Sequence, residues 1–175
     1  MPIKVFETLG GYQWRCEKEE ELHAFDKLLE YLKLEHVYIG YPNQVVEARK
    51  TQKKQYIKLF NKIGFLYRIT VGAPCHSSPI NTKRYEKASN LDEIPLYDFE
   101  FYIPKEKKWL EVCGTCIEED ENTNAYGIQT ITGKKVWSGC SGVGLNRLVY
   151  SFLSQFGFQE ENYPALISKY IRKVC

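Results

Sequence analysis

YDFEFYIPKEKKWLEVC, residues 97–113, is the stretch that decides the fold. Apolar or aromatic residues alternate with charged residues along 97–103 and again along 108–113, which is the period-two pattern of half-buried strands. Residues 104–107 join the two segments, and this connection is short enough for a hairpin. Strands joined by tight turns run antiparallel, so the pattern predicts an antiparallel sheet.

The rest of the chain predicts further strands and a set of helices packed on one face of that sheet. The segments with strand character are 12–17, 34–40, 65–72, 126–131 and 136–138. The segments with helical spacing of apolar residues are 18–33, 44–63, 145–156 and 164–174. Segments 73–95 and 118–124 are polar and are expected to be loops. The predicted fold class is α+β, an antiparallel β-sheet flanked by helices, with residues 1–175 forming one domain.

The composition limits the functions open to the chain. Its 24 basic and 22 acidic residues leave a net charge of +2, so any contact with nucleic acid has to be local. No segment approaches membrane-spanning length and no secretory leader is recognisable, so we expect a cytoplasmic protein without membrane contact. In that compartment the six cysteines are expected to be thiols.

Carboxylates gather on one face of the predicted hairpin. Alternation places Asp98 and Glu100 together on one side of their strand, and Glu111 lies on the face opposite its apolar neighbours. Carboxylate oxygens suit Mg²⁺, which also bridges nucleotide phosphates, so Glu111 and Glu100 are candidate magnesium ligands. The alternative is an ordinary solvated sheet face.

Ser138-Gly139-Cys140-Ser141-Gly142-Val143-Gly144 precedes the helix that carries Arg147. We predict a glycine-rich turn here, in which Gly142 and Gly144 let the backbone approach a phosphate at the helix N-terminus. Arg147 adds a permanently charged donor fork for phosphate. Close packing of the helix on the sheet is the alternative explanation of the glycines.

Arg15 and Glu17 share one face of the strand near the N-terminus. One could bind a phosphate while the other accepts a hydrogen bond from a base, or the two could form a surface ion pair. Cys113 and Cys116 are three residues apart on a predicted strand, so their side chains face opposite ways and a structural role is favoured over a shared zinc.

The order of five short motifs is more informative than any one of them. They are Trp14-Arg15-Cys16-Glu17, Leu34-Glu35-His36-Val37, Tyr97-Asp98-Phe99-Glu100, Trp109-Leu110-Glu111-Val112 and Gly142-Val143-Gly144-Leu145-Asn146-Arg147. In this order they resemble the catalytic core of class II aminoacyl-tRNA synthetases. The resemblance is to the seryl-tRNA synthetase branch and its truncated relatives, the amino acid:carrier-protein ligases, and it covers nearly the whole chain.

The resemblance implies an ATP site. Arg15 matches the arginine that holds the α-phosphate, Glu17 the nearby acid that faces adenine, and Arg147 the arginine on the γ-phosphate. Arg15 and Arg147 are thus the catalytic candidates. Glu111 matches the metal-binding glutamate of the branch, which implies Mg²⁺.

The resemblance also implies a zinc ion that captures the α-amino group of the substrate. Glu35 and Cys140 match two zinc ligands of the carrier-protein ligases and of the atypical archaeal seryl enzymes. The usual first zinc cysteine is absent, and Cys16 or Cys75 could supply the third ligand.

The implied function is ATP-dependent activation of a small amino acid to its aminoacyl adenylate, followed by transfer to an acceptor. The chain has no room for a coiled-coil arm and is nearly neutral, which favours a carrier protein or small molecule over tRNA. The chain also starts almost at the second class II motif, so a homodimer or a partner subunit is expected to supply the region of the first. Asn146 stands where a glutamate is common and Gly114 where a serine is expected. The alternative is therefore a non-catalytic accessory subunit that binds protein or RNA.

Overall fold

The structure is a computed structural model that describes residues 3–7, 12–14, 28–72 and 94–171, the side chains of residues 6, 7 and 12–14 excepted. The predicted strand 12–17, helix 18–33 and loop 73–95 lie partly outside these residues. In the described part of the chain, no helix is both long and apolar enough to cross a membrane.

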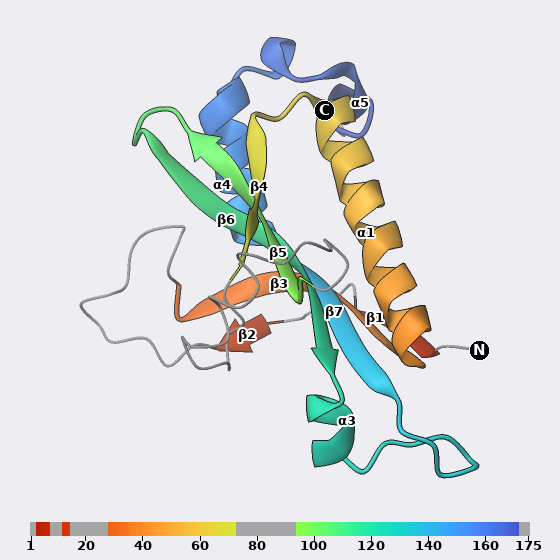
Figure 1. Ribbon diagram of the computed structural model, residues 1–175. Helices are drawn as coiled ribbons and strands as arrows, with labels where there is room; N and C mark the ends of the chain where they lie inside the picture. The colour runs from red at the N-terminus through yellow and green to blue at the C-terminus, as the bar shows by residue number, and fades with distance from the viewer. Residues whose placement is uncertain (1–2, 8–11, 15–27, 73–93, 172–175) are drawn as a thin grey trace.

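The described strands form an antiparallel sheet with the order β1-β3-β7-β6-β5-β4, and β2 pairs with β3 as well (Figure 1). The strands are β1 (Ile3–Glu7), β2 (Tyr12–Trp14), β3 (Glu30–Gly40), β4 (Tyr67–Val71), β5 (Leu96–Ile103), β6 (Lys108–Glu119) and β7 (Trp137–Gly144). The hairpin predicted from residues 97–113 is formed by β5 and β6, and the predicted α+β fold with an antiparallel sheet is confirmed.

Two long helices, α1 (Pro42–Ile63) and α4 (Leu145–Phe156), pack on the same face of the sheet. Gln44 Oε1 accepts a hydrogen bond from the Tyr41 backbone N–H at the start of α1, and Gly64 ends this helix with φ 88°. Smaller elements are α3 (Glu121–Ala125), the 3₁₀ helix η3 (Glu160–Asn162) and α5 (Ala165–Ser168).

The main core lies between these helices and the sheet. Its buried members are Tyr56, Phe60, Ile63, Phe65, Phe99, Phe101, Val112, Cys113 and Val143. Phe60 of α1 packs edge-on against Phe101 of β5 with ring centroids 4.9 Å apart, an arrangement that adds to the hydrophobic gain. Burial alternates strictly along β5, so Asp98 and Glu100 face away from the core as predicted.

A bulge in the β5–β6 pairing decides which residues of β6 share that outer face. The register shifts between Phe99 and Glu100, and both Val112 and Cys113 are buried. Glu111 therefore lies opposite Glu100, and Gly114 lies opposite Asp98. We call this side of the sheet, away from α1 and α4, the polar face.

Two sequence predictions about strand boundaries are wrong. Residues 30–33, expected at the end of a helix, begin β3, because Leu32 pairs with Tyr12 and Lys33 with Gly144. The glycine-rich segment 138–144, expected to be a turn, is strand β7, held by β3 on one side and β6 on the other. Pairing on both edges satisfies the backbone groups of a segment that has no conformational preference of its own.

Three further predictions are corrected in the connections. Residues 118–124 are not one loop, because β6 continues to Glu119 and α3 follows. Residues 126–131 form no strand and carry one isolated bridge, between Gln129 and Lys135. The expected helix 164–174 is reduced, within the described residues, to the single turn of α5.

Candidate active site

The candidate site lies on the polar face, where four paired residues form one row across the sheet. Asp98 of β5 pairs with Gly114 of β6, Gly114 with Gly142 of β7, and Gly142 with Glu35 of β3. Neighbouring strands are about 4.8 Å apart, so β5 with Asp98 and β3 with Glu35 lie roughly 14 Å apart, with the two glycine positions between them. At the centre of the polar face, Gly114 and Gly142 therefore form a strip that has no side chains of its own, and we call it the glycine strip.

Charged side chains from the outer strands lie over this strip. A Cβ at Gly142 would lie 2.3 Å from Lys33 Cε and 2.7 Å from Glu35 Oε2, and a Cβ at Gly114 would lie 3.2 Å from Asp98 Oδ1. Lys33 Nζ and Glu35 Oε2 are 2.6 Å apart in an ion pair. Gly142 thus makes room for an ion pair on a strand, whereas the sequence predicted a turn around a phosphate.

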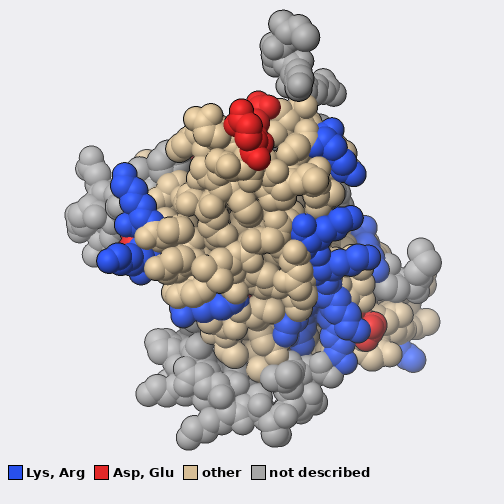
Figure 2. Space-filling model, turned by 90° about the horizontal axis from the view of Figure 1, so that it is seen from above, with Lys and Arg blue, Asp and Glu red and all other residues tan. Residues whose placement is uncertain are grey.

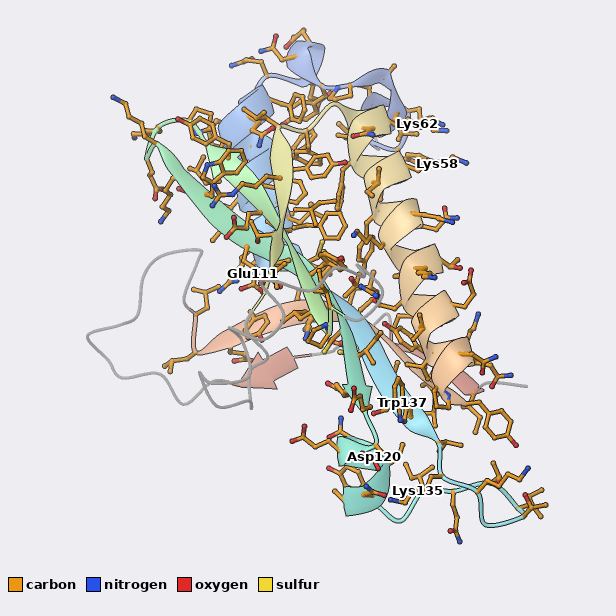
Figure 3. The ribbon with its side chains drawn as sticks, viewed as in Figure 1. Lys58, Lys62, Glu111, Asp120, Lys135 and Trp137 are labelled. Atoms are coloured by element: carbon orange, nitrogen blue, oxygen red, sulfur yellow. The ribbon has the colours of Figure 1, made fainter. Side chains whose placement is uncertain are left out.

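Arg147 and Glu111 meet at one end of the glycine strip. The guanidinium of Arg147 donates a hydrogen bond from Nη1 to the carbonyl oxygen of Glu111 at 2.9 Å, and Nη1 lies 3.7 Å from Glu111 Oε2. The side chain of Glu111, labelled in Figure 3, is 50% exposed, while that of Arg147 is 17% exposed. The Cβ position at Gly144 is 3.7 Å from Arg147 Cδ, so Gly144 borders the arginine. The predicted phosphate-binding arginine and the predicted metal-binding glutamate are neighbours.

Glu100, the second magnesium candidate, is already engaged. Arg68 of β4 donates from Nε to Glu100 Oε2 at 2.5 Å, and the same guanidinium lies 4.6 Å from the Trp109 ring centroid. This arrangement fixes Glu100 to an arginine, which leaves Glu111 as the more accessible carboxylate. Arg68 was missed by the sequence interpretation, although alternation along β4 places it on the polar face.

The surroundings of Asp98 favour the protonated form of its carboxyl group. Burial, and then the charges of Glu111 and Glu100, raise the pKa of its carboxyl group to about 7. Two neighbouring carboxylates thus add negative charge around Asp98, and a site of this kind favours a positively charged ligand.

The predicted zinc ligands Glu35 and Cys140 lie further along the polar face. Cys140 Sγ donates to Glu118 Oε1 at 3.8 Å, and Glu35 is paired with Lys33. Burial, followed by the charges of Glu118, Glu35 and Cys116, raises the pKa of the Cys140 thiol, which keeps it protonated. Glu118 and Lys33 were missed because the sequence placed them in a loop and a helix.

The described residues fit Mg²⁺ better than they fit Zn²⁺. Among these residues, no three side chains of His, Cys, Asp or Glu come together to hold a metal ion. A catalytic zinc takes three protein ligands, so Glu35 and Cys140 do not suffice by themselves. Mg²⁺ is commonly held by one or two carboxylates and substrate phosphates, and Glu111 fits that role. Arg15, Glu17 and Cys16 lie outside the described residues.

Asn146, beside the candidate arginine, has a structural contact. Its Oδ1 accepts a hydrogen bond of 2.8 Å from the backbone N–H of Leu32 in β3. The bond ties the first turn of α4 to the strand that carries Lys33 and Glu35. Asn146 therefore helps to hold Arg147 at the end of the sheet.

The arrangement of sheet and helices has a clear match among solved structures. The fold is that of class II aminoacyl-tRNA synthetases. The M. kandleri SerRS, solved in complex with A. aeolicus tRNASec, superimposes with a TM-score of 0.80 at 21% identity over 97% of this chain and 33% of that one. Cytoplasmic serine–tRNA ligase of Naegleria fowleri in complex with AMP gives a TM-score of 0.70 at 15% identity, covering 97% of this chain and 35% of that one.

Sequence relatives are more specific. Type-2 serine–tRNA ligases are homologues of the chain, and the resemblance predicted from the five motifs is confirmed. The enzyme of Methanocaldococcus jannaschii is 29% identical over 178 aligned residues, and that of Methanococcus maripaludis strain C5 is 30% identical over 178. No family model matches the chain.

The match covers one part of those enzymes. It includes 99% of this chain but 33% of the M. jannaschii ligase and 34% of the M. maripaludis one. The chain thus spans about a third of the length of the curated relatives it matches. The acceptor in the relatives' name is tRNA, and the preference for a carrier protein, drawn from the near-neutral charge, has no support from them.

Proposed function

We propose that the polar face binds ATP and an amino acid and forms an aminoacyl adenylate, whose acyl group passes to tRNA. In the first step an oxygen of the amino acid carboxylate attacks the α-phosphorus of ATP, and the bond to the β-phosphate breaks. Pyrophosphate leaves with the electron pair. In the second step a hydroxyl of the RNA attacks the acyl carbon, and AMP leaves.

The observation that best supports the proposal is the contact between Arg147 and Glu111. A backbone carbonyl holds the guanidinium of Arg147, so less conformational freedom is lost when the group meets a phosphate. A preorganised guanidinium stabilises charge that develops on the leaving pyrophosphate. Mg²⁺, when bound, would add charge neutralisation at the phosphates, with Glu111 as its ligand.

The remaining assignments complete this proposal. Arg15 and Glu17 are proposed to contact the α-phosphate and adenine, in line with the motif they match. Gly142 and Gly144 are proposed to leave the glycine strip open to the nucleotide once the Lys33 side chain moves aside. Zinc at Glu35, Cys140 and Cys16 stays a prediction, and no step above depends on it.

Serine is the proposed amino acid and tRNA the proposed acceptor, because both appear in the name of the homologues. The near-neutral net charge of +2, which had favoured a carrier protein, describes the whole chain and says nothing of local charge. AMP in the N. fowleri complex supports an adenine nucleotide as the ligand of this fold.

Exchange of labelled pyrophosphate into ATP, measured with each amino acid in turn, tests the proposal. We expect serine-dependent exchange that falls by about 10²–10³ in Arg147→Ala, as for loss of one preorganised donor. Lys105→Ala removes a charge from the β5–β6 turn and should retain exchange. A folded native protein that is silent with every amino acid and Mg²⁺ would instead support the non-catalytic accessory role.

A further inference from the structure

Helix α1 carries a row of lysines on the side that faces away from the sheet. Lys50, Lys54, Lys58 and Lys62 follow one another at intervals of four residues. The last three are exposed and Lys50 is half-buried. In Figure 3 the labelled side chains of Lys58 and Lys62 point outward from the helix. We call these four residues the lysine row.

The helix concentrates more positive charge than the whole chain. It contains five lysines and one arginine against one acid, Glu47, whereas the chain has a net charge of +2. Two of the basic groups contact the sheet: Arg49 is buried at 1% exposure, and the half-buried Lys53 has its Nζ 3.3 Å from the Tyr97 ring centroid. Figure 2 shows basic side chains gathered on the side of the molecule where α1 lies.

Repulsion between the lysines of this row destabilises helix α1. Residues four apart are neighbours on a helix, and each like-charged pair at that spacing costs about 0.2–0.5 kcal/mol. Among the described residues, none forms an ion pair with Lys54, Lys58 or Lys62. Three of the four lysines in the row thus carry positive charge that no described acid neutralises, which is the arrangement expected for a surface that meets a polyanion.

The dimensions of the row fit a phosphate backbone. Twelve residues separate its ends, which at 1.5 Å per residue is about 18 Å. Neighbouring lysines are about 6 Å apart along the axis, so four ammonium groups can each meet a phosphate of one strand. Lysine is a point charge that contacts phosphate without reading bases.

From these observations we propose that the lysine row binds the phosphate backbone of RNA. The proposal rests on the proposed function in one respect, since the tRNA acceptor makes RNA the polyanion to expect. A membrane fits less well, because interfacial helices insert an apolar face into lipid. The apolar face of α1, with Val45, Tyr56 and Phe60, is buried in the protein core.

The row and the candidate active site lie on opposite sides of the sheet. Helix α1 covers the face that holds Phe99 and Phe101, whereas Glu111 is on the polar face. Substitutions in the row should therefore leave pyrophosphate exchange unchanged. Exchange needs no RNA, so it tests the proposed function independently of RNA binding.

The experiment compares two variants with equal loss of charge. The row variant is Lys50→Gln, Lys54→Gln, Lys58→Gln and Lys62→Gln, and glutamine preserves helix propensity. The control variant is Lys105→Gln, Lys107→Gln, Lys134→Gln and Lys169→Gln, at exposed positions outside α1. Binding of labelled bulk tRNA is measured by anisotropy from 50 to 300 mM KCl, with circular dichroism as the check on folding.

We expect the native protein and the control to bind alike and the row variant to bind at least tenfold more weakly. The slope of log K against log salt should fall by about 4, roughly one for each phosphate contact. If the row variant is misfolded, Lys58→Gln with Lys62→Gln should lower the slope by about 2.

Three results would overturn the proposal. The first is equal loss in the row and control variants, which would mean that only total charge matters. The second is no tRNA binding by the native protein. The third is row-dependent binding to phosphatidylserine vesicles that tRNA does not compete away, which would assign the row to a membrane. Serine-dependent exchange together with any of these would retain the proposed formation of the aminoacyl adenylate and remove the lysine row from the proposed function.

Discussion

Arg147 and Glu111 are joined through the backbone as well as through their charges. Arg147 Nη1 bonds to the Glu111 carbonyl oxygen at 2.9 Å and lies 3.7 Å from the Glu111 carboxylate. The hydrogen bond uses a main-chain atom, so it persists when the Glu111 side chain is changed. The carboxylate can therefore be removed without releasing the arginine, which separates the two roles experimentally.

Glu111→Gln should raise the Mg²⁺ concentration needed for half-maximal exchange by at least tenfold. The amide keeps the size of the side chain but lacks the charge that a hard cation prefers. Exchange at varied Mg²⁺ and saturating ATP measures the effect. Glu119→Gln, at an exposed position of the same strand, should leave the Mg²⁺ requirement unchanged. An equal shift in both variants would exclude Glu111 as the ligand.

Asp98→Asn should change how stability depends on pH in metal-free buffer. The pKa of Asp98 is raised to about 7 by burial and by Glu111 and Glu100, against about 3.9 in an unfolded chain. Between these values the folded state holds a proton that the unfolded state has lost, so stability falls as pH rises from about 4 to about 7. Asparagine carries no such proton, and the variant should lose less stability between pH 5 and pH 8.

Thermal unfolding at pH 5 and pH 8 checks this expectation. Asp120→Asn is the matched control, because a hydrogen bond from Asn124 and its contact with Lys135 lower the pKa of Asp120. Asp120 is thus ionised throughout that range, and its variant should follow the native pH dependence. A native-like pH dependence in Asp98→Asn would show that another group is responsible.

Gly139→Ala should be severely destabilising, by about 3 kcal/mol or more. A Cβ there would lie 2.4 Å from the Tyr38 ring and 2.6 Å from the Cys116 carbonyl oxygen. The one proton of the Tyr38 hydroxyl lies within donating distance of two carbonyl oxygens, that of Cys116 at 2.9 Å and that of Cys140 at 3.0 Å, so the ring cannot move without weakening this hydrogen bond.

Urea unfolding compares this variant with Gly144→Ala. At Gly144 the nearest atom to a new Cβ is 3.6 Å away, and φ is −75°, a value open to alanine. The second substitution should change stability by less than about 1 kcal/mol. Similar losses at the two positions would contradict the packing described for Tyr38.

Arg68→Met should lower the free energy of unfolding by roughly 1 kcal/mol, and only part of this loss should depend on the salt concentration. The ion pair with Glu100 is partly exposed and screened by solvent, whereas the stack on Trp109 is not screened in the same way. Urea unfolding at 50 mM and 500 mM NaCl separates the two contributions. Fluorescence of the native protein and the variant should differ, since the indole of Trp109 loses its cationic neighbour. An unchanged spectrum and stability would argue against the contact.

Much of the fold was predictable because its patterns are local. The alternation in 97–103 reports directly which side chains are buried, and Phe99 and Phe101 are fully buried as expected. The spacing of Val45, Tyr56 and Phe60 likewise predicts the buried side of α1. The candidates Glu111 and Arg147 were each named from a short motif, and the structure brings these two distant parts of the sequence into contact.

Other features could not be predicted from local sequence. The backbone of 138–144 is extended because β3 and β6 pair with it on both sides, whereas its glycines are compatible with a turn. The bulge that buries both Val112 and Cys113 depends on the register with β5. Arg68 and Glu100 meet because β4 and β5 pair, although the two residues lie 32 positions apart in the sequence.

The sequence by itself determined the alternation of the hairpin, the order of the class II motifs and the four-residue spacing of the lysine row, because these depend on neighbours along the chain. Only the tertiary structure decided that Arg147 contacts Glu111, that Gly142 lies beneath the Lys33–Glu35 ion pair, and that the row faces outward. Each of these depends on strand pairing or on burial of a helix face. Such long-range contacts follow from the free energy of the whole packed sheet, which no short segment specifies.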